Sequence, residues 1–131
     1  MARSRPHRVL VVDDQVAVAE VVRDALEEAG YAVTLTSTGV SALNLIAYDP
    51  PDVVLLDLGL RDMLGLEVLD RLRARWPEIP VIILSGTQDP DLAKSARARG
   101  AADYVTKPFE LQRLLQVVRV ILATRIRGPQ A

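Results

Sequence analysis

The chain alternates between short apolar runs and longer segments in which apolar residues recur every three or four positions. The short runs are rich in Val, Ile and Leu and predict five strands. They lie at residues 8–14, 31–37, 52–58, 80–86 and 102–107. The first, third and fourth runs are too uniformly apolar for strands with one face in water, so we expect these three at the centre of a sheet.

The segments between the strands have the periodicity of amphipathic helices. They lie near residues 15–29, 38–48, 64–75, 89–99 and 109–125. Gly30 and Gly100 stand where two of these helices should end, and Asp89 before Pro90 is typical of an N-cap followed by a first-turn proline. Five alternations of strand and helix predict an α/β fold with a parallel sheet covered on both faces.

Composition narrows the class of protein. The chain has 131 residues, half of them hydrophobic, a net charge of -1 and no cysteine. These values predict one globular domain over 8–125, with a flexible arm at 1–7 and a tail or linker start at 126–131. They exclude a disulfide framework and a thiolate zinc site, and they favour a cytoplasmic protein that binds neither nucleic acid nor a membrane directly.

Polar residues stand at the carboxyl ends of four predicted strands, where open α/β sheets bind ligands. Asp13 and Asp14 end the first strand, Asp57 the third, Ser85 the fourth and Lys107 the fifth. Two like charges ~4 Å apart repel by about 4 kcal/mol at an effective dielectric of 20, and one lysine does not offset three carboxylates. The pattern therefore predicts a bound Mg²⁺, for which an all-oxygen site is suited and Mn²⁺ is a substitute.

A metal ion beside a carboxylate, a hydroxyl and a lysine suits phosphoryl transfer, and a carboxylate can itself be the nucleophile. In this order, the motifs VLVVDDQ, VVLLDLGL, VIILSG and YVTKPFE resemble those of the receiver domain of two-component response regulators, over about 8–125. The resemblance implies a flavodoxin-like, doubly wound sheet of five strands in the order 2-1-3-4-5, with five helices. It also implies phosphoryl transfer from the phosphohistidine of a sensor histidine kinase or phosphotransfer protein.

The resemblance assigns a role to each residue that matches a family motif. Asp57 would be the phosphoacceptor and a metal ligand. Asp14 would bind Mg²⁺ directly, Asp13 through water, and the backbone carbonyl of Gly59 would be a further ligand.

The remaining matching residues would act on the phosphoryl group or report its presence. Lys107 would pair with the phosphoryl oxygens, and its peptide bond to Pro108 is typically cis in this family. Ser85 would be the switch hydroxyl, and Tyr104 the aromatic residue whose rotamer changes with the switch.

Each of these residues also has a purely structural interpretation. Asp57 could be a loop or N-cap aspartate, and Asp14 could cap the first helix. Lys107 could be an ordinary exposed lysine, Ser85 could begin a turn, and Tyr104 could be a packing residue with its hydroxyl in water.

The chain departs from the family pattern in the loop that follows Asp57. Arg61 stands where a proline is usual, and Leu64 stands where an aspartate is common. Gly59 has no side chain at a position that tunes loss of the phosphoryl group in this family. Trp76 is interpreted as a packing residue only.

Three other functions compete with a phosphorylated switch. A haloacid-dehalogenase-like phosphohydrolase needs a second aspartate at the position of Gly59, so this function is disfavoured. A flavin or nucleotide binder needs a glycine- or hydroxyl-rich phosphate loop after the first strand, where this chain has DDQVAVAE. The third is a receiver-like interaction module without phosphoryl chemistry.

The resemblance also implies how the signal leaves the domain. The surface of the fourth helix, fifth strand and fifth helix would control a partner or a fused output domain. A phosphorylation-linked homodimer through this face would use Arg97, Arg99 and Asp103. The domain would not be an enzyme beyond self-catalysed phosphoryl transfer and autodephosphorylation.

Overall fold

Five strands alternate with five helices in the computed structural model, which describes residues 5–87 and 89–126. The strands are β1 (Arg8–Val12), β2 (Ala32–Thr36), β3 (Val53–Asp57), β4 (Val81–Ser85) and β5 (Asp103–Thr106). The helices are α1 (Val16–Glu28), α2 (Gly39–Tyr48), α3 (Gly65–Arg75), α4 (Pro90–Ala98) and α5 (Leu111–Ile126). All ten predicted element types are confirmed, with small shifts at the ends. Most of the predicted arm and tail, residues 1–4 and 127–131, lies outside the described residues.

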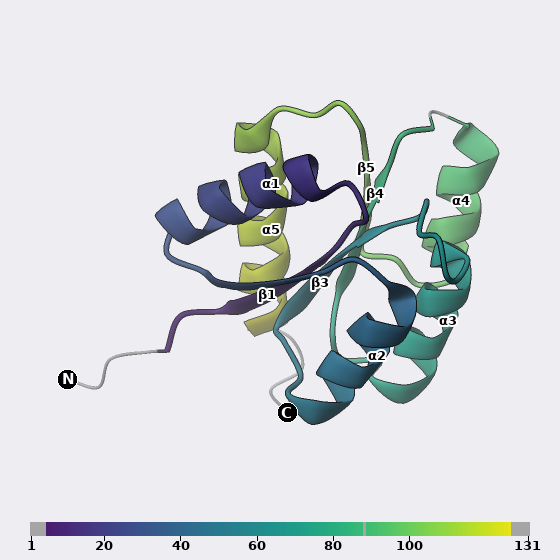
Figure 1. Cartoon of the computed structure of the whole chain (residues 1–131), viewed down its shortest axis with the longest axis horizontal. Helices are drawn as coiled ribbons and strands as arrows, with labels where there is room; N and C mark the ends of the chain where they lie inside the picture. Colours follow the sequence, from purple (N-terminus) through teal and green to yellow (C-terminus); the bar gives the residue numbers. More distant parts are fainter. Residues whose placement is uncertain (1–4, 88, 127–131) are drawn as a thin grey trace.

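The strands form one parallel sheet in the order β2-β1-β3-β4-β5 (Figure 1). This confirms the expected order and the central place of β1, β3 and β4. Every residue of β3 and β4 is buried, as expected of parallel strands covered on both faces, whereas no residue of the edge strand β2 is fully buried.

Helices cover both faces of the sheet and divide the core into two layers (Figure 1). On one side, α1 and α5 pack on a layer that contains Val9 and Val11 of β1. On the other side, α2, α3 and α4 pack on a layer that contains Leu10 and Val12. This division follows from the alternation of side chains along each strand.

The helix ends carry the predicted signals. Gly30 and Gly100 both have a φ of +101°, in the left-handed region that commonly ends a helix. The side chain of Asp89 accepts a hydrogen bond from the N–H of Asp91, and Pro90 begins α4. These contacts confirm the predicted ends of α1 and both ends of α4.

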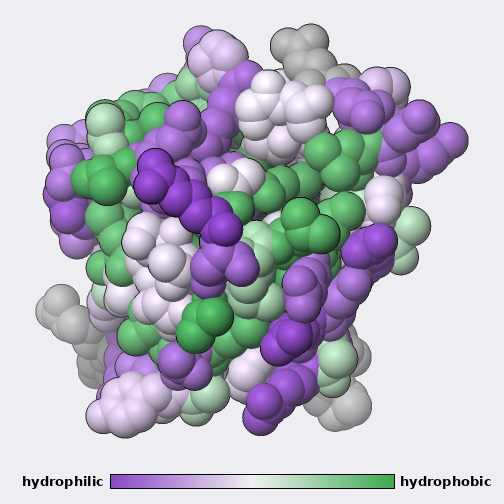
Figure 2. Space-filling model, turned by 45° about the vertical axis from the view of Figure 1, so that its right-hand side comes forward, coloured by the Kyte–Doolittle hydropathy of each residue, from purple (hydrophilic) through white to green (hydrophobic). Residues whose placement is uncertain are grey.

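Helix α4 has little anchorage in the core. Ala96 is its only fully buried residue, and Leu92 and Ala93 pack against the core with part of their surface exposed. Figure 2 brings forward the side of the molecule that carries α3 and α4, where hydrophobic surface is bordered by hydrophilic side chains.

Within the described part of the chain, no helix combines the length and apolarity needed to cross a membrane.

Candidate functional site

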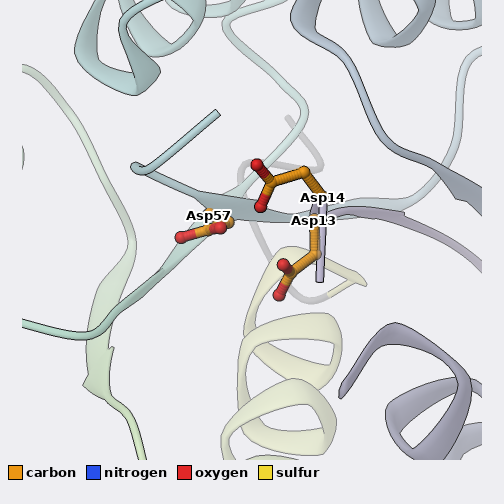
Figure 3. Close-up of side chains that lie close together, drawn as sticks. All are labelled: Asp13, Asp14 and Asp57. Atoms are coloured by element: carbon orange, nitrogen blue, oxygen red, sulfur yellow. The ribbon is translucent and has the colours of Figure 1, made fainter. Parts of the chain in front are cut away.

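Three carboxylates meet at the carboxyl ends of β1 and β3 (Figure 3). Asp57 is the last residue of β3, and Asp13 and Asp14 follow β1 directly. The parallel register pairs Val12 with Leu56, which aligns the two strand ends. Carboxylate oxygens of Asp13, Asp14 and Asp57 lie within 4.8 Å of one another. The structure therefore brings together the three acidic residues that the sequence placed at strand ends.

Lys107 reaches this acidic cluster from the end of β5. Its Nζ lies 2.8 Å from Oδ2 of Asp13 and 3.7 Å from Oδ2 of Asp57, and its side chain is only 12% exposed. Nζ also donates a hydrogen bond to Oε1 of Gln15 at 2.8 Å. The interpretation of Lys107 as an ordinary exposed lysine is therefore wrong. Gln15 had no role in the sequence analysis, although it directly follows the acidic pair.

The surroundings of the Asp57 carboxylate shift its pKa. Burial raises its pKa above the ordinary value, and the nearby Asp13 carboxylate acts in the same direction. A hydrogen bond of 3.1 Å from the N–H of Gly59 and the Lys107 ammonium act in the opposite direction without cancelling the rise. The charged form of Asp57 is thus disfavoured in this cluster.

The alternative structural roles of the aspartates do not match the structure. The N-cap of α1 is Gln15 and not Asp14, and the Asp13 carboxylate accepts a hydrogen bond from the N–H of Gln15 at 2.9 Å. Asp57 belongs to a strand and is 6% exposed, so it is neither a helix cap nor a loop residue.

The chemistry of the cluster fits a hard divalent cation. Its three clustered ligands are all carboxylate oxygens, which Mg²⁺ prefers. Two of the three aspartates are buried, and a buried carboxylate is costly unless a positive charge compensates it. Lys107 contacts two of the carboxylates and cannot neutralise three, so the residues present suit an added cation.

Ser85 and Tyr104 lie on the adjacent strands β4 and β5. Ser85 is 3% exposed, and its Oγ accepts a hydrogen bond from the N–H of Thr87 at 3.2 Å, so it does begin a turn. Tyr104 is 7% exposed and packs in the core layer under α2, α3 and α4. Its hydroxyl donates a hydrogen bond to the carbonyl of Thr87 at 3.4 Å, so Tyr104 is a packing residue whose hydroxyl also contacts the backbone.

The loop from Leu58 to Leu64 is tied to neighbouring elements at two points. Both carboxylate oxygens of Asp62 accept hydrogen bonds from the start of α2, from the N–H of Gly39 at 2.8 Å and of Val40 at 3.0 Å. A Cβ on Gly65 would lie 2.4 Å from the Cα of Leu58, so this close approach requires glycine. The peptide bond between Lys107 and Pro108, beyond β5, is cis as expected.

The charged residues considered for a dimer interface form ion pairs within one copy of the chain. Arg97 lies 3.4 Å from Asp103, and Arg99 lies 3.0 Å from Asp70. All four side chains are at least a quarter exposed, so these pairs hold the face only weakly.

A groove of about 530 Å³ between α2 and α3 is separate from the acidic cluster. Its lining includes Val40, Leu43, Met63 and Trp76, and none of the three clustered aspartates. The guanidinium of Arg75 lies 4.9 Å from the centre of the Trp76 ring. Trp76 packs against the core, as expected, and also lines this groove.

Similarity to known sequences covers most of the chain. The family model of the response regulator receiver domain matches residues 9–119 of this chain. The transcriptional regulatory protein KdpE of Mycobacterium tuberculosis is 47% identical over 111 residues, which cover 85% of this chain and 49% of KdpE. The response regulator MprA of Mycobacterium sp. strain KMS is 41% identical over 117 residues, covering 89% of this chain and 51% of MprA. The chain thus spans about half the length of these curated relatives.

Similarity to solved structures extends to the whole fold. A CheY-like receiver domain protein from Methanospirillum hungatei JF-1 superposes with a TM-score of 0.91 at 27% identity, covering 95% of this chain and 99% of that protein. The receiver domain of NtrX from Brucella abortus gives a TM-score of 0.85 at 36% identity, covering 88% and 98%. The chain therefore belongs to the receiver domain family of two-component response regulators, in which an aspartate accepts a phosphoryl group.

Proposed function

We propose that Asp57 accepts the phosphoryl group, from the phosphohistidine of a sensor histidine kinase or phosphotransfer protein. A carboxylate oxygen of Asp57 forms a bond to phosphorus while the phosphorus–nitrogen bond breaks, and its electron pair returns to the histidine ring. The convergence of Asp13, Asp14, Asp57 and Lys107 carries this proposal. Reaction of the aspartyl phosphate with water would reset the domain, so its catalysis is limited to its own phosphorylation and dephosphorylation.

The same cluster would hold Mg²⁺, with Mn²⁺ as a substitute. Asp14 and Asp57 would be direct ligands, Asp13 would bind through water, and the backbone carbonyl of Gly59 would complete the protein's share. The ion would supply positive charge that offsets the phosphoryl oxygens. The close approach of three carboxylate oxygens and the raised pKa of Asp57, due mainly to burial, support this assignment.

Lys107 would change partners when Asp57 is phosphorylated. Its ammonium contacts Asp13 and lies near Asp57, so a phosphoryl group on Asp57 would come within its reach. Pairing with a phosphoryl oxygen would stabilise the negative charge that the transition state spreads over the phosphoryl oxygens.

Phosphorylation would be reported by Ser85 and Tyr104. Ser85 ends β4 next to β3, and its hydroxyl would turn toward the phosphoryl group. The Tyr104 hydroxyl contacts the loop that begins after Ser85, so a shift of this loop would change its contact with Thr87. The lightly anchored α4 would then move, and the α4-β5-α5 surface would change its preference for a partner.

Partners beyond the phosphoryl donor follow from the family and the relatives. KdpE is described as a transcriptional regulatory protein, and this chain matches about half of its length. We infer that the α4-β5-α5 surface controls an output partner or a fused output domain in the cytoplasm. A homodimer through this face would require Arg97, Arg99 and Asp103 to exchange their present contacts for contacts between copies.

The test is phosphorylation by acetyl phosphate, measured as the mass increase of the intact protein with and without Mg²⁺. The variants are Asp57→Asn and, as a matched control, Asp24→Asn at an exposed position on α1. We expect wild type and Asp24→Asn to gain one phosphoryl group only when Mg²⁺ is present, and Asp57→Asn to gain none. Modification of Asp57→Asn at the wild-type rate would reject Asp57 as the acceptor.

A further inference from the structure

Asp14 is paired with a cation that the family pattern does not supply. Nε of Arg61 lies 3.4 Å from Oδ2 of Asp14. The ion pairs of Lys107 are with Asp13 and Asp57, so Arg61 is the cation beside the Asp14 carboxylate among the described residues. A proline at position 61, which is usual in this family, would place no charge there.

The backbone beside Arg61 is anchored, while its side chain is free to move. Asp62 is tied to the start of α2 by two hydrogen bonds, which fix the loop next to the acidic cluster. The Arg61 side chain is 88% exposed, whereas that of Asp14 is 17% exposed. The guanidinium can therefore reach Asp14 from a fixed base and turn away into water at little cost.

We propose that Arg61 competes with a divalent cation for the Asp14 carboxylate. This inference rests on the proposed function, because it requires Mg²⁺ to bind at Asp13, Asp14 and Asp57. The three carboxylates face two cations, Lys107 and Arg61, and a bound divalent ion would give the site a net positive charge unless Arg61 turned away. Metal binding therefore breaks the pair between Arg61 and Asp14. The affinity of the site for the divalent ion is therefore lower than it would be without the arginine.

Equilibrium metal binding tests this competition without phosphorylation. Mg²⁺ affinity is measured by calorimetry, and Mn²⁺ affinity by electron paramagnetic resonance of the free ion. The proteins are wild type, Arg61→Gln, Arg61→Lys and the control Arg119→Gln, which removes an exposed arginine from α5. Circular dichroism establishes that each variant is folded.

We expect Arg61→Gln to bind both ions about two- to fivefold more tightly than wild type at low salt, the range typical of an exposed ion pair. Arg61→Lys and Arg119→Gln should stay close to wild type. The difference in metal affinity between Arg61→Gln and wild type should narrow at about 0.5 M salt, because exposed charges are then screened.

The outcomes separate this inference from the proposed function. Equal or weaker binding by Arg61→Gln, or an equal gain in Arg119→Gln, would overturn the competition and leave the metal site standing. Folded wild-type protein that bound neither ion would overturn the metal site and the competition together.

Discussion

The ammonium group of Lys107 is the main internal counter-charge of the acidic cluster. It contacts Asp13 and lies near Asp57, in surroundings that leave only 12% of the lysine side chain exposed. Removing one partner of a buried ion pair leaves the other charge unpaired, which is more costly than the loss of an exposed pair.

Replacing Lys107 with methionine tests this role. We expect Lys107→Met to lower the free energy of unfolding by about 2–4 kcal/mol without divalent cations, because two buried carboxylates lose their cation. Millimolar Mg²⁺ should recover part of this loss. Urea denaturation measures both effects, with Lys94→Met on the exposed side of α4 as the control. Equal losses in the two variants would contradict the role of Lys107.

The residues of the cluster could be predicted, but their contacts could not. Asp13, Asp14, Asp57 and Lys107 stand at strand ends, and a parallel sheet brings such ends to one edge. The hydrogen bond from Lys107 to Gln15 depends on the rotamers of both side chains, which the hydrophobic periodicity of the sequence does not predict.

Two further contacts lay beyond sequence reasoning for the same reason. The pair between Arg61 and Asp14 depends on the course of a loop that departs from the family pattern. The hydrogen bond from the Tyr104 hydroxyl to the Thr87 carbonyl depends on the rotamer of the tyrosine. The positions were visible in the sequence, whereas the partners required coordinates.

At the scale of elements, the carboxylate of Asp62 joins the loop after β3 to the start of α2. The N–H groups of Val40 and Gly39 hold the pKa of Asp62 below its ordinary value of 3.8. Ionised Asp62 therefore stabilises the fold above the ordinary pKa, and this stabilisation is lost as the pH falls through the lowered value.

The pH dependence of thermal unfolding tests this link. We expect Asp62→Asn to have a lower Tm than wild type near neutral pH, because the neutral amide is a weaker acceptor at the start of a helix. The difference in Tm should stay constant down to the ordinary pKa of 3.8 and shrink below it, since wild type then also loses the charge. A gap that does not change with pH, or one equally large in Asp24→Asn, would contradict the link.

Helices α3 and α4 differ in how firmly they are held. Leu69 of α3 is completely buried, whereas Leu92 of α4 keeps part of its surface exposed. We expect Leu69→Ala to cost about 2–5 kcal/mol and Leu92→Ala about 1 kcal/mol, because only the first leaves a full cavity. Chemical denaturation measures both. Equal costs would mean that α4 is as firmly anchored as α3 and would weaken its proposed role in switching.

For the whole molecule, the α/β architecture could be predicted from hydrophobic periodicity, and the strand order could not. Uniformly apolar runs identify β1, β3 and β4 as central strands because both of their faces are covered. Periodicity does not say which central strand lies beside β2 or β5, and the order 2-1-3-4-5 came from the resemblance to receiver domains. The sheet topology confirms it.

The curated relatives extend beyond the region that this chain matches. The chain matches about half of KdpE and MprA. We propose that its output is either a fused domain or a separate partner. Both arrangements require the same first event, which is phosphorylation of one carboxylate at the strand ends.

The most direct measurement locates that phosphoryl group. Wild-type protein is treated with acetyl phosphate and Mg²⁺ and then with borohydride, which reduces an aspartyl phosphate to homoserine, and peptide mass spectrometry finds the converted residue. We expect homoserine at position 57, at neither 13 nor 14, and none when Mg²⁺ is withheld. Homoserine at another aspartate, or equal conversion of Asp57 without a divalent cation, would contradict it.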